Sequence, residues 1–330
     1  MKKTRISLLF SLLLTVQMQA QSLSPYSLKA GREAVLLGAG VVSYGTAYAL
    51  NRGLSPLTVS GIQALKRSNV PRFDQSAIDR YSPKAAQLSD LTLGAGIGLT
   101  GVVMISVKAP ANARPQGTLL GAESRLVEPD YSFFKSELFT VGVMYVETML
   151  LTNGVKSTVK NAFERTRPLA YNPAATLDEK LEKDTQRSFY SGHAANAFAT
   201  AVFAAEVFRH YHPDSRAKPW VWIGSLGLAT GTAYLRYEAG QHFPSDLLVG
   251  AAVGSLAGWG IPKLHEKRGG NSQLINLSVM PWSNGTASGL SIRWSISSQS
   301  FVAKQSSQNH PNDKNFRAYS PGKRQTHLFD

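Results

Sequence analysis

The sequence contains no cysteine and comparatively few acidic residues. Without cysteine among its 330 residues, disulfide bonds, thiolate catalysis and cysteine-bound zinc are all excluded. Asp and Glu total 21 against 35 Lys and Arg, which leaves a net charge of +14. A basic excess favours anionic partners such as phosphate esters, acidic lipid head groups or nucleic acid. Hydrophobic residues make up 43% of the chain, which excludes disorder throughout.

Residues 1–20 have the pattern of an export signal. Lys2, Lys3 and Arg5 precede a short apolar run, and Ala20 is a small residue suited to peptidase cleavage. The apolar run is shorter than the roughly 20 residues that span a bilayer, so a cleaved signal is favoured over an anchor. We therefore expect an exported protein of the bacterial periplasm or cell envelope.

Six stretches that are rich in Gly and Ala and poor in charge are predicted to be helices. They cover residues 34–51, 91–107, 138–153, 194–208, 219–235 and 247–261. Small residues let helix backbones approach closely, which suits a tightly packed bundle. Each uncharged run is a little short for a membrane span, which favours a peripheral or globular bundle over a conventional six-span protein. The predicted fold class is all-α, with about six core helices within residues 21–269.

The sequence pattern changes after the helical region. Residues 274–281 and 289–298 alternate apolar and polar side chains around Asn284-Gly285, which predicts a small β-hairpin within residues 270–298. Residues 299–330 are polar and rich in Ser, Gln, Asn and Lys, as is typical of a disordered tail. The expected organisation is thus a signal, a helical domain, a hairpin and a polar tail.

Lys160 and Arg167 form the first group of residues suited to phosphate chemistry. They are seven residues apart, nearly two helical turns, so both cations are expected to project from one helix face. Two permanent cations suit a phosphate group, with Arg able to bind two oxygens at once. A solvated basic helix face has the same pattern, so this pair alone does not distinguish a phosphate site from an ordinary surface.

The second group, Ser191-Gly192-His193, leads directly into the fourth predicted helix. Ser191 is expected to cap that helix, while Gly192 lets a ligand approach the backbone. The free N–H groups and the helix dipole favour an anion here, and His193 is placed to protonate a leaving oxygen. A capped helix with an incidental histidine explains this segment equally well.

The third group consists of Arg236, His242 and Asp246. The four-residue spacing puts His242 and Asp246 on the same side, so the carboxylate can hold one ring nitrogen and leave the other free to attack. Alone, such a pair is more often a surface hydrogen bond. Because all three groups lie at helix ends, a bundle of alternating helices can bring them together at one end.

Together the three groups resemble the phosphatidic acid phosphatase type 2 / vanadium haloperoxidase superfamily. The motifs are matched in order by Lys160…Arg167-Pro168, Ser191-Gly192-His193 and Arg236…His242…Asp246, within about residues 136–258. Two positions depart from the usual pattern, since Tyr190 stands in place of proline and Leu235 in place of serine. The missing serine removes one potential hydrogen bond to phosphate.

The resemblance implies a metal-independent phosphatase without a cofactor, acting on a phosphate monoester or diphosphate. His242 would be the nucleophile that forms a phosphohistidine, Asp246 would orient it, and His193 would serve as general acid and then base. The phosphate-binding residues would be Lys160, Arg167, Ser191, Gly192 and Arg236. The favoured substrate is a phosphorylated lipid at or near a membrane, and no nucleic-acid partner is expected.

Other readings of the same residues remain open. A soluble periplasmic acid phosphatase of broad specificity would use this site, and a haloperoxidase would hold vanadate there. A non-catalytic envelope protein would bind anionic lipid through the cations alone, although binding needs no His–Asp pair. A metal site built from His193, His242 and Asp246 is disfavoured because three permanent cations would repel a divalent ion.

Glu147 lies in the third predicted helix, thirteen residues before Lys160. If it is buried there, its carboxylate needs a partner, such as a tyrosine or a helix-capping group. His265, His310 and His327 lie beyond the predicted helical core, and the sequence assigns them no role.

Overall fold

The computed structural model describes residues 24–53, 55–107, 131–267, 273–283 and 288–298. The predicted signal and the predicted polar tail both lie outside these residues. The chain divides into two compact units, residues 1–267 and residues 268–330, which are described separately below.

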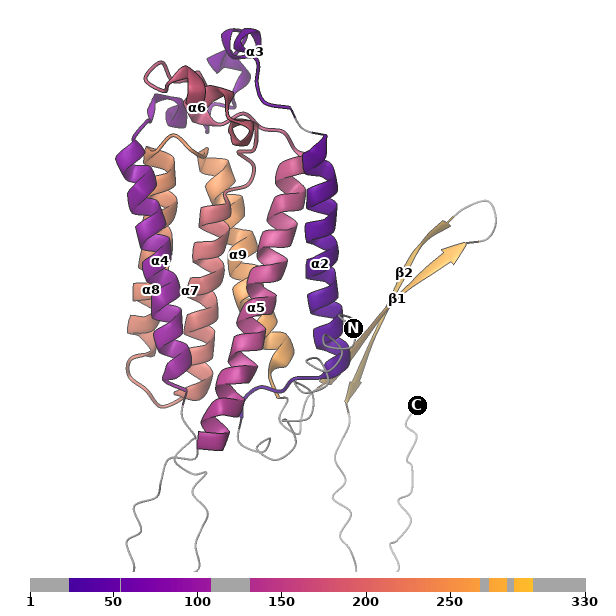
Figure 1. Ribbon diagram of the computed structural model, residues 1–330. Helices are drawn as coiled ribbons and strands as arrows, with labels where there is room; N and C mark the ends of the chain where they lie inside the picture. The colour runs from indigo at the N-terminus through magenta and orange to yellow at the C-terminus, as the bar shows by residue number, and fades with distance from the viewer. Residues whose placement is uncertain (1–23, 54, 108–130, 268–272, 284–287, 299–330) are drawn as a thin grey trace, which may run out of the picture. The chain divides into compact units, whose positions relative to one another are not determined.

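Six long helices form the first unit within the described residues. They are α2 (Ala30–Arg52), α4 (Pro83–Ile105), α5 (Tyr131–Ala162), α7 (Gly192–Tyr211), α8 (Lys218–Glu238) and α9 (Pro244–His265). Figure 1 shows them side by side as a bundle. The six predicted helices are confirmed. Each is longer than its uncharged run, because helices continue through charged residues such as Lys156 and Lys160 in α5.

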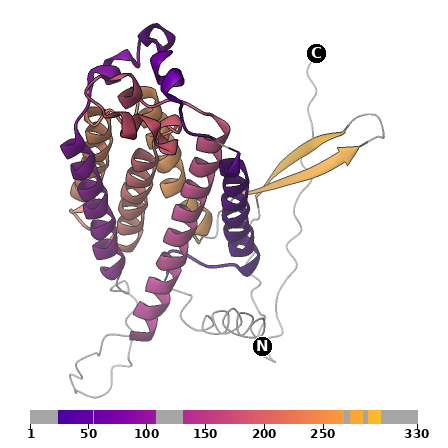
Figure 2. The ribbon, with the colours of Figure 1, turned by 45° about the horizontal axis from the view of Figure 1, so that its top comes forward.

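Short elements cover one end of this bundle. Figures 1 and 2 show α3 (Val59–Gln63) and α6 (Leu177–Leu181) over that end. Four short 3₁₀ helices accompany them: Arg67–Asn69, Gln75–Asp79, Pro168–Tyr171 and Lys183–Gln186. Side-chain caps begin the two short α-helices: the backbone N–H of Gly61 donates to Oγ1 of Thr58 at 3.1 Å, and that of Glu179 donates to Oγ1 of Thr176 at 3.3 Å.

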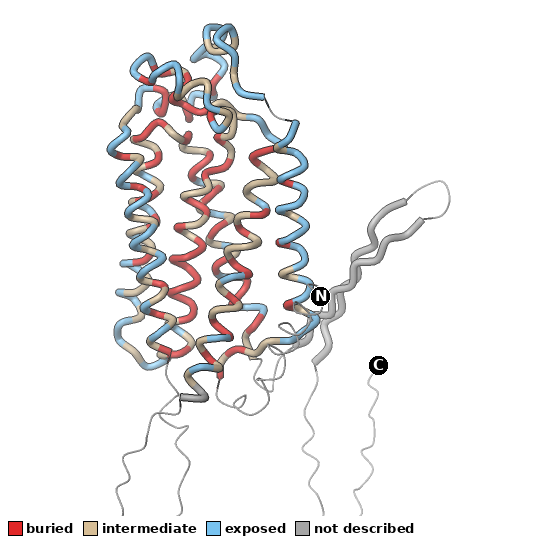
Figure 3. Tube along the Cα trace, in the orientation of Figure 1, coloured by how far each residue is buried: buried red, intermediate tan, exposed pale blue. Residues whose placement is uncertain are grey.

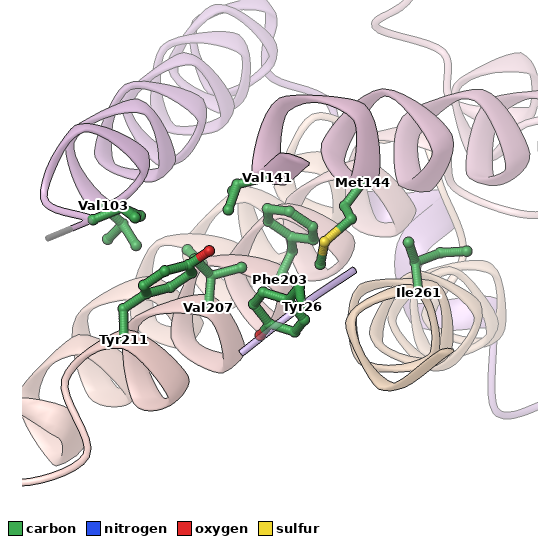
Figure 4. Packing of buried hydrophobic residues seen from close by; sticks show 10 residues of the cluster. Tyr26, Val103, Val141, Met144, Phe203, Val207, Tyr211 and Ile261 are labelled. Atoms are coloured by element: carbon green, nitrogen blue, oxygen red, sulfur yellow. The ribbon is translucent and has the colours of Figure 1, made fainter. Parts of the chain in front are cut away.

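Helix α7 is the central element of the bundle. It contacts α4, α5, α8 and α9, and Figure 3 shows it buried along most of its length. Around Phe203 of α7 packs a cluster that includes Met144 from α5 and Ile261 from α9, shown in Figure 4. The packing of this core fixes the relative positions of α5, α7 and α9. The predicted motif residues lie at the other ends of these helices.

Helices α7 and α9 are in direct backbone contact. Gly250, Gly254 and Gly258 recur every four residues on α9 and all face α7. A Cβ atom at Gly254 would lie 2.1 Å from the carbonyl oxygen of Ala195, which leaves no room for a side chain. The expectation that small residues allow close helix packing is therefore confirmed for this pair.

The outer surface of the bundle is apolar. Large side chains on different helices are mostly exposed, among them Val35, Leu91, Trp220 and Leu256. Among the described residues, four helical segments are long and apolar enough to cross a membrane: Ala30–Arg52, Pro83–Ile105, Phe134–Ala162 and Pro244–His265. The expectation that the runs are too short to span is wrong for these four, because the helices extend beyond their uncharged stretches. Such a surface indicates association with a membrane.

Two antiparallel strands, β1 (Gln273–Ser283) and β2 (Ser288–Ser298), belong to the second unit. Their register runs from Gln273 opposite Ser298 to Ser283 opposite Ser288. The predicted turn at Asn284-Gly285 lies outside the described residues, so the hairpin at 270–298 stays a prediction.

Candidate active site

The three groups of motif residues meet at the end of the bundle that α3 and α6 cover. Lys160 is in the last turn of α5, Arg236 in the last turn of α8, and Asp246 in the first turn of α9. Ser191 immediately precedes α7, and its backbone N–H donates to the carbonyl oxygen of Asp246 at 3.1 Å. The predicted convergence of the helix ends thus places the motif residues together.

His242 is fully buried in the short turn between α8 and α9. Its Nδ1 lies 3.8 Å from Oδ2 of Asp246 and has no hydrogen-bond partner among the described residues. The expected His–Asp pairing is therefore a close approach without a hydrogen bond. Burial lowers the pKa of His242 well below its usual value, and nearby cations, Lys160 and Arg167 foremost, lower it further. A lowered pKa favours the neutral form of the ring, which is the form that can attack an electrophile.

Three donors hold the carboxylate of Asp246 in place. Oδ2 accepts from Oγ of Ser188 at 2.6 Å and from the backbone N–H of Phe243 at 3.0 Å. Oδ1 accepts from Arg165 at 2.5 Å, and Arg165 in turn donates to Asp74 at 2.7 Å. Sequence analysis missed Arg165, Ser188 and Asp74, because only the fold brings such distant segments beside Asp246.

Lys160 and Arg167 do not share a helix face, so that prediction is wrong. Helix α5 ends at Ala162, and Arg167 has extended backbone, as a residue before proline prefers. The backbone N–H of Arg167 donates instead to the carbonyl oxygen of Thr185 at 2.8 Å. A tertiary contact, not helical periodicity, brings this cation to the site.

The cationic side chains of the site have N–H groups that remain available to a ligand. Lys160 donates to the carbonyl oxygen of Arg187 at 2.8 Å, and Arg236 donates to Oγ of Ser89 at 3.3 Å. The Nε atoms of Arg167, Arg187 and Arg236 are buried and have no partner among the described residues. A bound oxyanion would satisfy such donors.

Asp184 marks the point on which the cations converge. Its carboxylate accepts from Arg167 and lies 3.6 Å from Arg187. Burial raises the pKa of Asp184, but Arg167, Lys160, Arg187 and Arg236 outweigh it and lower the pKa overall. Because this side chain is half exposed, an anionic substrate would compete with it for Arg167. Sequence analysis also missed this residue.

The start of α7 has the predicted cap. The backbone N–H of Ala194 donates to Oγ of Ser191 at 3.3 Å. A Cβ atom at Gly192 would lie 2.7 Å from Cδ of Lys156, so this glycine lets a further cation approach the backbone. Lys156 lies one turn before Lys160, a spacing that could have revealed it in the sequence.

His193 has a carboxylate partner that sequence analysis missed. Its Nε2 lies 2.7 Å from Oδ1 of Asp90 on α4. The same oxygen is 3.8 Å from Arg236, so Asp90 links the histidine to the cation cluster. The side chain of Asp90 is largely exposed, which places His193 at the open side of the site.

Comparison with known proteins assigns the family. Residues 141–269, which include every predicted site residue, match the model of the PAP2 superfamily. This region belongs to the PAP2 superfamily. A lipid A 4′-phosphatase from Bacteroides thetaiotaomicron is 31% identical to this chain over 139 residues, which are 39% of this chain and 57% of that protein. The chain thus covers little more than half the length of this relative.

Two further similar proteins come from Porphyromonas gingivalis. A lipid A 1-phosphatase is 33% identical over 110 residues, 33% of this chain and 20% of that protein. A lipid A 4′-phosphatase is 26% identical over 171 residues, 51% of this chain and 68% of that protein. Among solved structures, a transmembrane PAP2-type phosphatidylglycerolphosphate phosphatase from Bacillus subtilis has a TM-score of 0.37 at 18% identity, covering 70% of this chain and 96% of that one.

Proposed function

We propose that this protein is a lipid phosphatase that works without metal, through a phosphohistidine at His242. One observation carries the proposal: the fully buried imidazole of His242 lies near the cations Lys160, Arg167 and Arg236. Buried donors beside it lack hydrogen-bond partners among the described residues. Cations select a phosphate group and a neutral imidazole attacks it. Three permanent cations at this point also disfavour a divalent ion there.

The first step transfers the phosphoryl group to the enzyme. Nε2 of His242 attacks phosphorus while the bond from phosphorus to the alcohol oxygen breaks. His193 gives its proton to the departing alkoxide. Burial and the nearby Arg236 lower the pKa of His193 to about 4, so this step requires the bound phosphate anion to raise that pKa. Asp246, whose Oδ2 is 3.8 Å from Nδ1, offsets the positive charge that the ring acquires. The cations stabilise the phosphoryl oxygens through the transition state.

The second step releases phosphate. His193, now neutral, takes a proton from water as the water oxygen attacks phosphorus. The bond between Nε2 of His242 and phosphorus breaks, and its electron pair returns to the ring. Ser191 and the backbone N–H of Gly192, at the start of α7, contribute further donors to the leaving phosphate.

The substrate we propose is a phosphate group on a membrane lipid. The apolar exterior and the four span-capable helices would place the site near a membrane surface. The relatives named as lipid A phosphatases make the 1- and 4′-phosphates of lipid A the first to test. The predicted export signal at residues 1–20 would put this chemistry in the periplasm or cell envelope.

The decisive experiment is phosphate release by the full chain in detergent, with chelator present. The substrates would be lipid A, phosphatidate, a polyprenyl diphosphate and a soluble aryl phosphate. We expect release from a lipid, and a loss of more than about 10³-fold in His242→Ala, because that variant lacks the nucleophile. His210→Gln, altered at the far end of α7, serves as the matched control and keeps its activity. Labelled phosphate should remain on the wild-type chain in an acid-labile, base-stable form.

Each contrary result points to a different alternative. Hydrolysis of the soluble ester alone would indicate a broad acid phosphatase. Lipid binding that survives in His242→Ala without any turnover by the wild type would indicate a non-catalytic binding protein. Immediate loss of turnover on adding chelator would refute the metal-independent mechanism.

A further inference from the structure

A second group of buried titratable side chains lies away from the candidate active site. Glu33 in the first turn of α2, Glu147 on α5 and His265 at the end of α9 have one ligand atom each, all within 4.8 Å of one another. Glu147 precedes Lys160 by thirteen residues, which is roughly 20 Å along a helix. The group therefore lies toward the opposite end of the bundle from His242.

Two members of this group, Glu147 and His265, are buried with polar atoms that lack a hydrogen-bond partner among the described residues. Glu147 and His265 are both 0% exposed. Neither carboxylate oxygen of Glu147, nor Nε2 of His265, has a hydrogen-bond partner among the described residues. A buried carboxylate left in this way costs considerable free energy. The neighbour of Glu147 is thus a histidine that sequence analysis left without a role, not the tyrosine or helix cap it suggested.

The orientation of His265 suits a metal ligand. Its Nδ1 donates to the carbonyl oxygen of Ile261 at 2.8 Å, which leaves the lone pair on Nε2. Nε2 is 3.0 Å from Oε1 of Glu33 and 3.2 Å from Oε2 of Glu147, yet it hydrogen-bonds to neither. A proton on Nε2 would not be directed at either oxygen. Metal-bound histidines commonly pair their second ring nitrogen with a backbone carbonyl in this way.

The spacing of the ligand atoms agrees with a small four-coordinate ion. Ligands about 2.0–2.1 Å from a tetrahedral ion lie about 3.3 Å from one another. The contacts of Nε2 with the two carboxylates, 3.0 and 3.2 Å, are close to that value. One imidazole with two carboxylates is a donor set for zinc and its neighbours, whereas Mg²⁺ and Ca²⁺ prefer oxygen alone.

We propose that Glu33, Glu147 and His265 bind one divalent transition-metal ion, with Zn²⁺ as the best fit. The ion would join α2, α5 and α9 far from the phosphate site, so its contribution is to stability and not to catalysis. Glu33 is already oriented for this role, because its Oε2 accepts from the backbone N–H of Lys29 at 2.7 Å.

The competing arrangement is an ion-pair network without metal. Arg32 lies 2.7 Å from Oε1 of Glu33, and with a protonated His265 it would balance the two carboxylates. That network leaves both oxygens of Glu147 without a hydrogen bond, whereas a bound ion would take one of them as a ligand. Both oxygens of Glu33 accept hydrogen bonds in either arrangement, whereas Nε2 of His265 and the carboxylate of Glu147 gain a partner only when an ion is bound.

Metal content and metal binding test the proposal. The full chain, carrying a purification tag free of histidine, would be analysed for metals and, after prolonged dialysis against chelator, titrated with Zn²⁺. We expect about one Zn²⁺ per chain and a rise in the midpoint of thermal unfolding when Zn²⁺ is returned. Glu147→Gln should lose both the bound Zn²⁺ and the rise in the thermal midpoint. Co²⁺ should give the wild type the visible absorption of a four-coordinate site.

Glu137→Gln is the matched control. Glu137 is also a buried glutamate on α5, but it accepts hydrogen bonds from Ser24 and Tyr211, so its variant should still bind Zn²⁺. Wild type that neither carries metal nor binds Zn²⁺ at one equivalent overturns the proposal in favour of the ion-pair network. Equal binding by Glu147→Gln also overturns it. If Glu147→Gln does not fold, the loss of Zn²⁺ binding in Glu33→Gln and the titration of the wild type test the proposal instead.

This test is independent of the catalytic mechanism. Glu147→Gln should keep phosphate release at temperatures where it remains folded, while His242→Ala should keep its Zn²⁺. Brief exposure to chelator should leave turnover unchanged, and only prolonged dialysis should lower the thermal midpoint.

Discussion

At the scale of single residues, the position of Asp246 depends on side chains outside the motifs. Arg165 holds Oδ1 and is itself held by Asp74, while Ser188 holds Oδ2. Arg165 also lies over the ring of Phe243, 4.3 Å from its centroid, so it contacts the residue beside His242. These contacts make Arg165 a positioning residue that acts through Asp246.

Replacing Arg165 tests this role. Arg165→Met should lower kcat by about 10- to 100-fold with little change in KM, because a carboxylate displaced by about 1 Å supports His242 poorly. Arg165→Lys should restore part of kcat. The control Arg209→Met removes an ion pair with Glu206 at the other end of α7 and should change neither constant. A rise in KM alone would mean that Arg165 binds substrate directly.

The pH profile tests the electrostatics of His242. Burial, then Lys160, Arg167 and Arg236, lower the pKa of this ring, so it stays unprotonated below about 6.5, where an ordinary histidine gains its proton. The unprotonated, nucleophilic form of His242 should therefore remain in mildly acidic solution, and kcat/KM should fall only at still lower pH. In Arg236→Gln one cation is gone, the pKa of His242 should rise, and the acid limb should move to higher pH. Ionisation of the substrate is common to both enzymes, so a limb that stays in place would contradict this account.

At the scale of elements, the contact between α7 and α9 sets the distance between two motifs. Ser191 and Gly192 begin α7, and Asp246 lies in the first turn of α9. The glycines at 250, 254 and 258 let the two backbones touch along their length. Any side chain there must push the helices apart and shift Asp246 from the start of α7.

Gly254→Ala should therefore destabilise the fold, although alanine has a higher helix propensity than glycine. A Cβ atom 2.1 Å from the oxygen of Ala195 cannot be accommodated without moving the helix, which we expect to cost about 1–3 kcal/mol. Thermal unfolding followed by circular dichroism should show a lower midpoint, with reduced phosphate release. Gly260→Ala, on the same helix with nothing within 4 Å of the added atom, should be neutral or stabilising. Equal midpoints for both variants would refute tight packing.

At the scale of the whole molecule, the helical unit has apolar side chains on its exterior as well as in its core. Large apolar residues such as Val41, Val102 and Leu248 are exposed, while Glu137, Glu147 and other polar groups are buried. Exposed apolar surface of this extent is stable only when lipid or another apolar phase covers it.

Fractionation of cells tests membrane association. The full chain should stay in the membrane pellet through high salt and alkaline carbonate and enter solution only with detergent, because apolar burial rather than charge holds it. As control, Leu256→Gln changes one exposed side chain and should leave this behaviour unchanged. Release by salt alone would show that the +14 net charge, and not the apolar exterior, attaches the protein to the membrane.

Much of the architecture could be predicted from the sequence because it depends on local chemistry. The six helices follow from runs of helix-compatible residues without charge, and the α7 cap follows from Ser191. The motif residues could be proposed together because their spacing places each at a helix end. The full lengths of the helices could not be predicted from the sequence, because α5 continues through charged residues that a hydropathy pattern excludes.

What the sequence by itself determined is the set of helices and the resemblance of its motifs to a phosphatase superfamily, and from these it predicted the residues that bind and attack a phosphate. Only the tertiary structure decided which groups support them. Asp74 and Asp90 reach the site from segments with no motif, and Arg165, which lies between the two cations of the first motif, contacts Asp246. It also brought Glu33, Glu147 and His265 together from three helices. The physical reason is that periodicity and capping act over a few residues, whereas the partners of a buried charge are set by packing between helices distant in sequence.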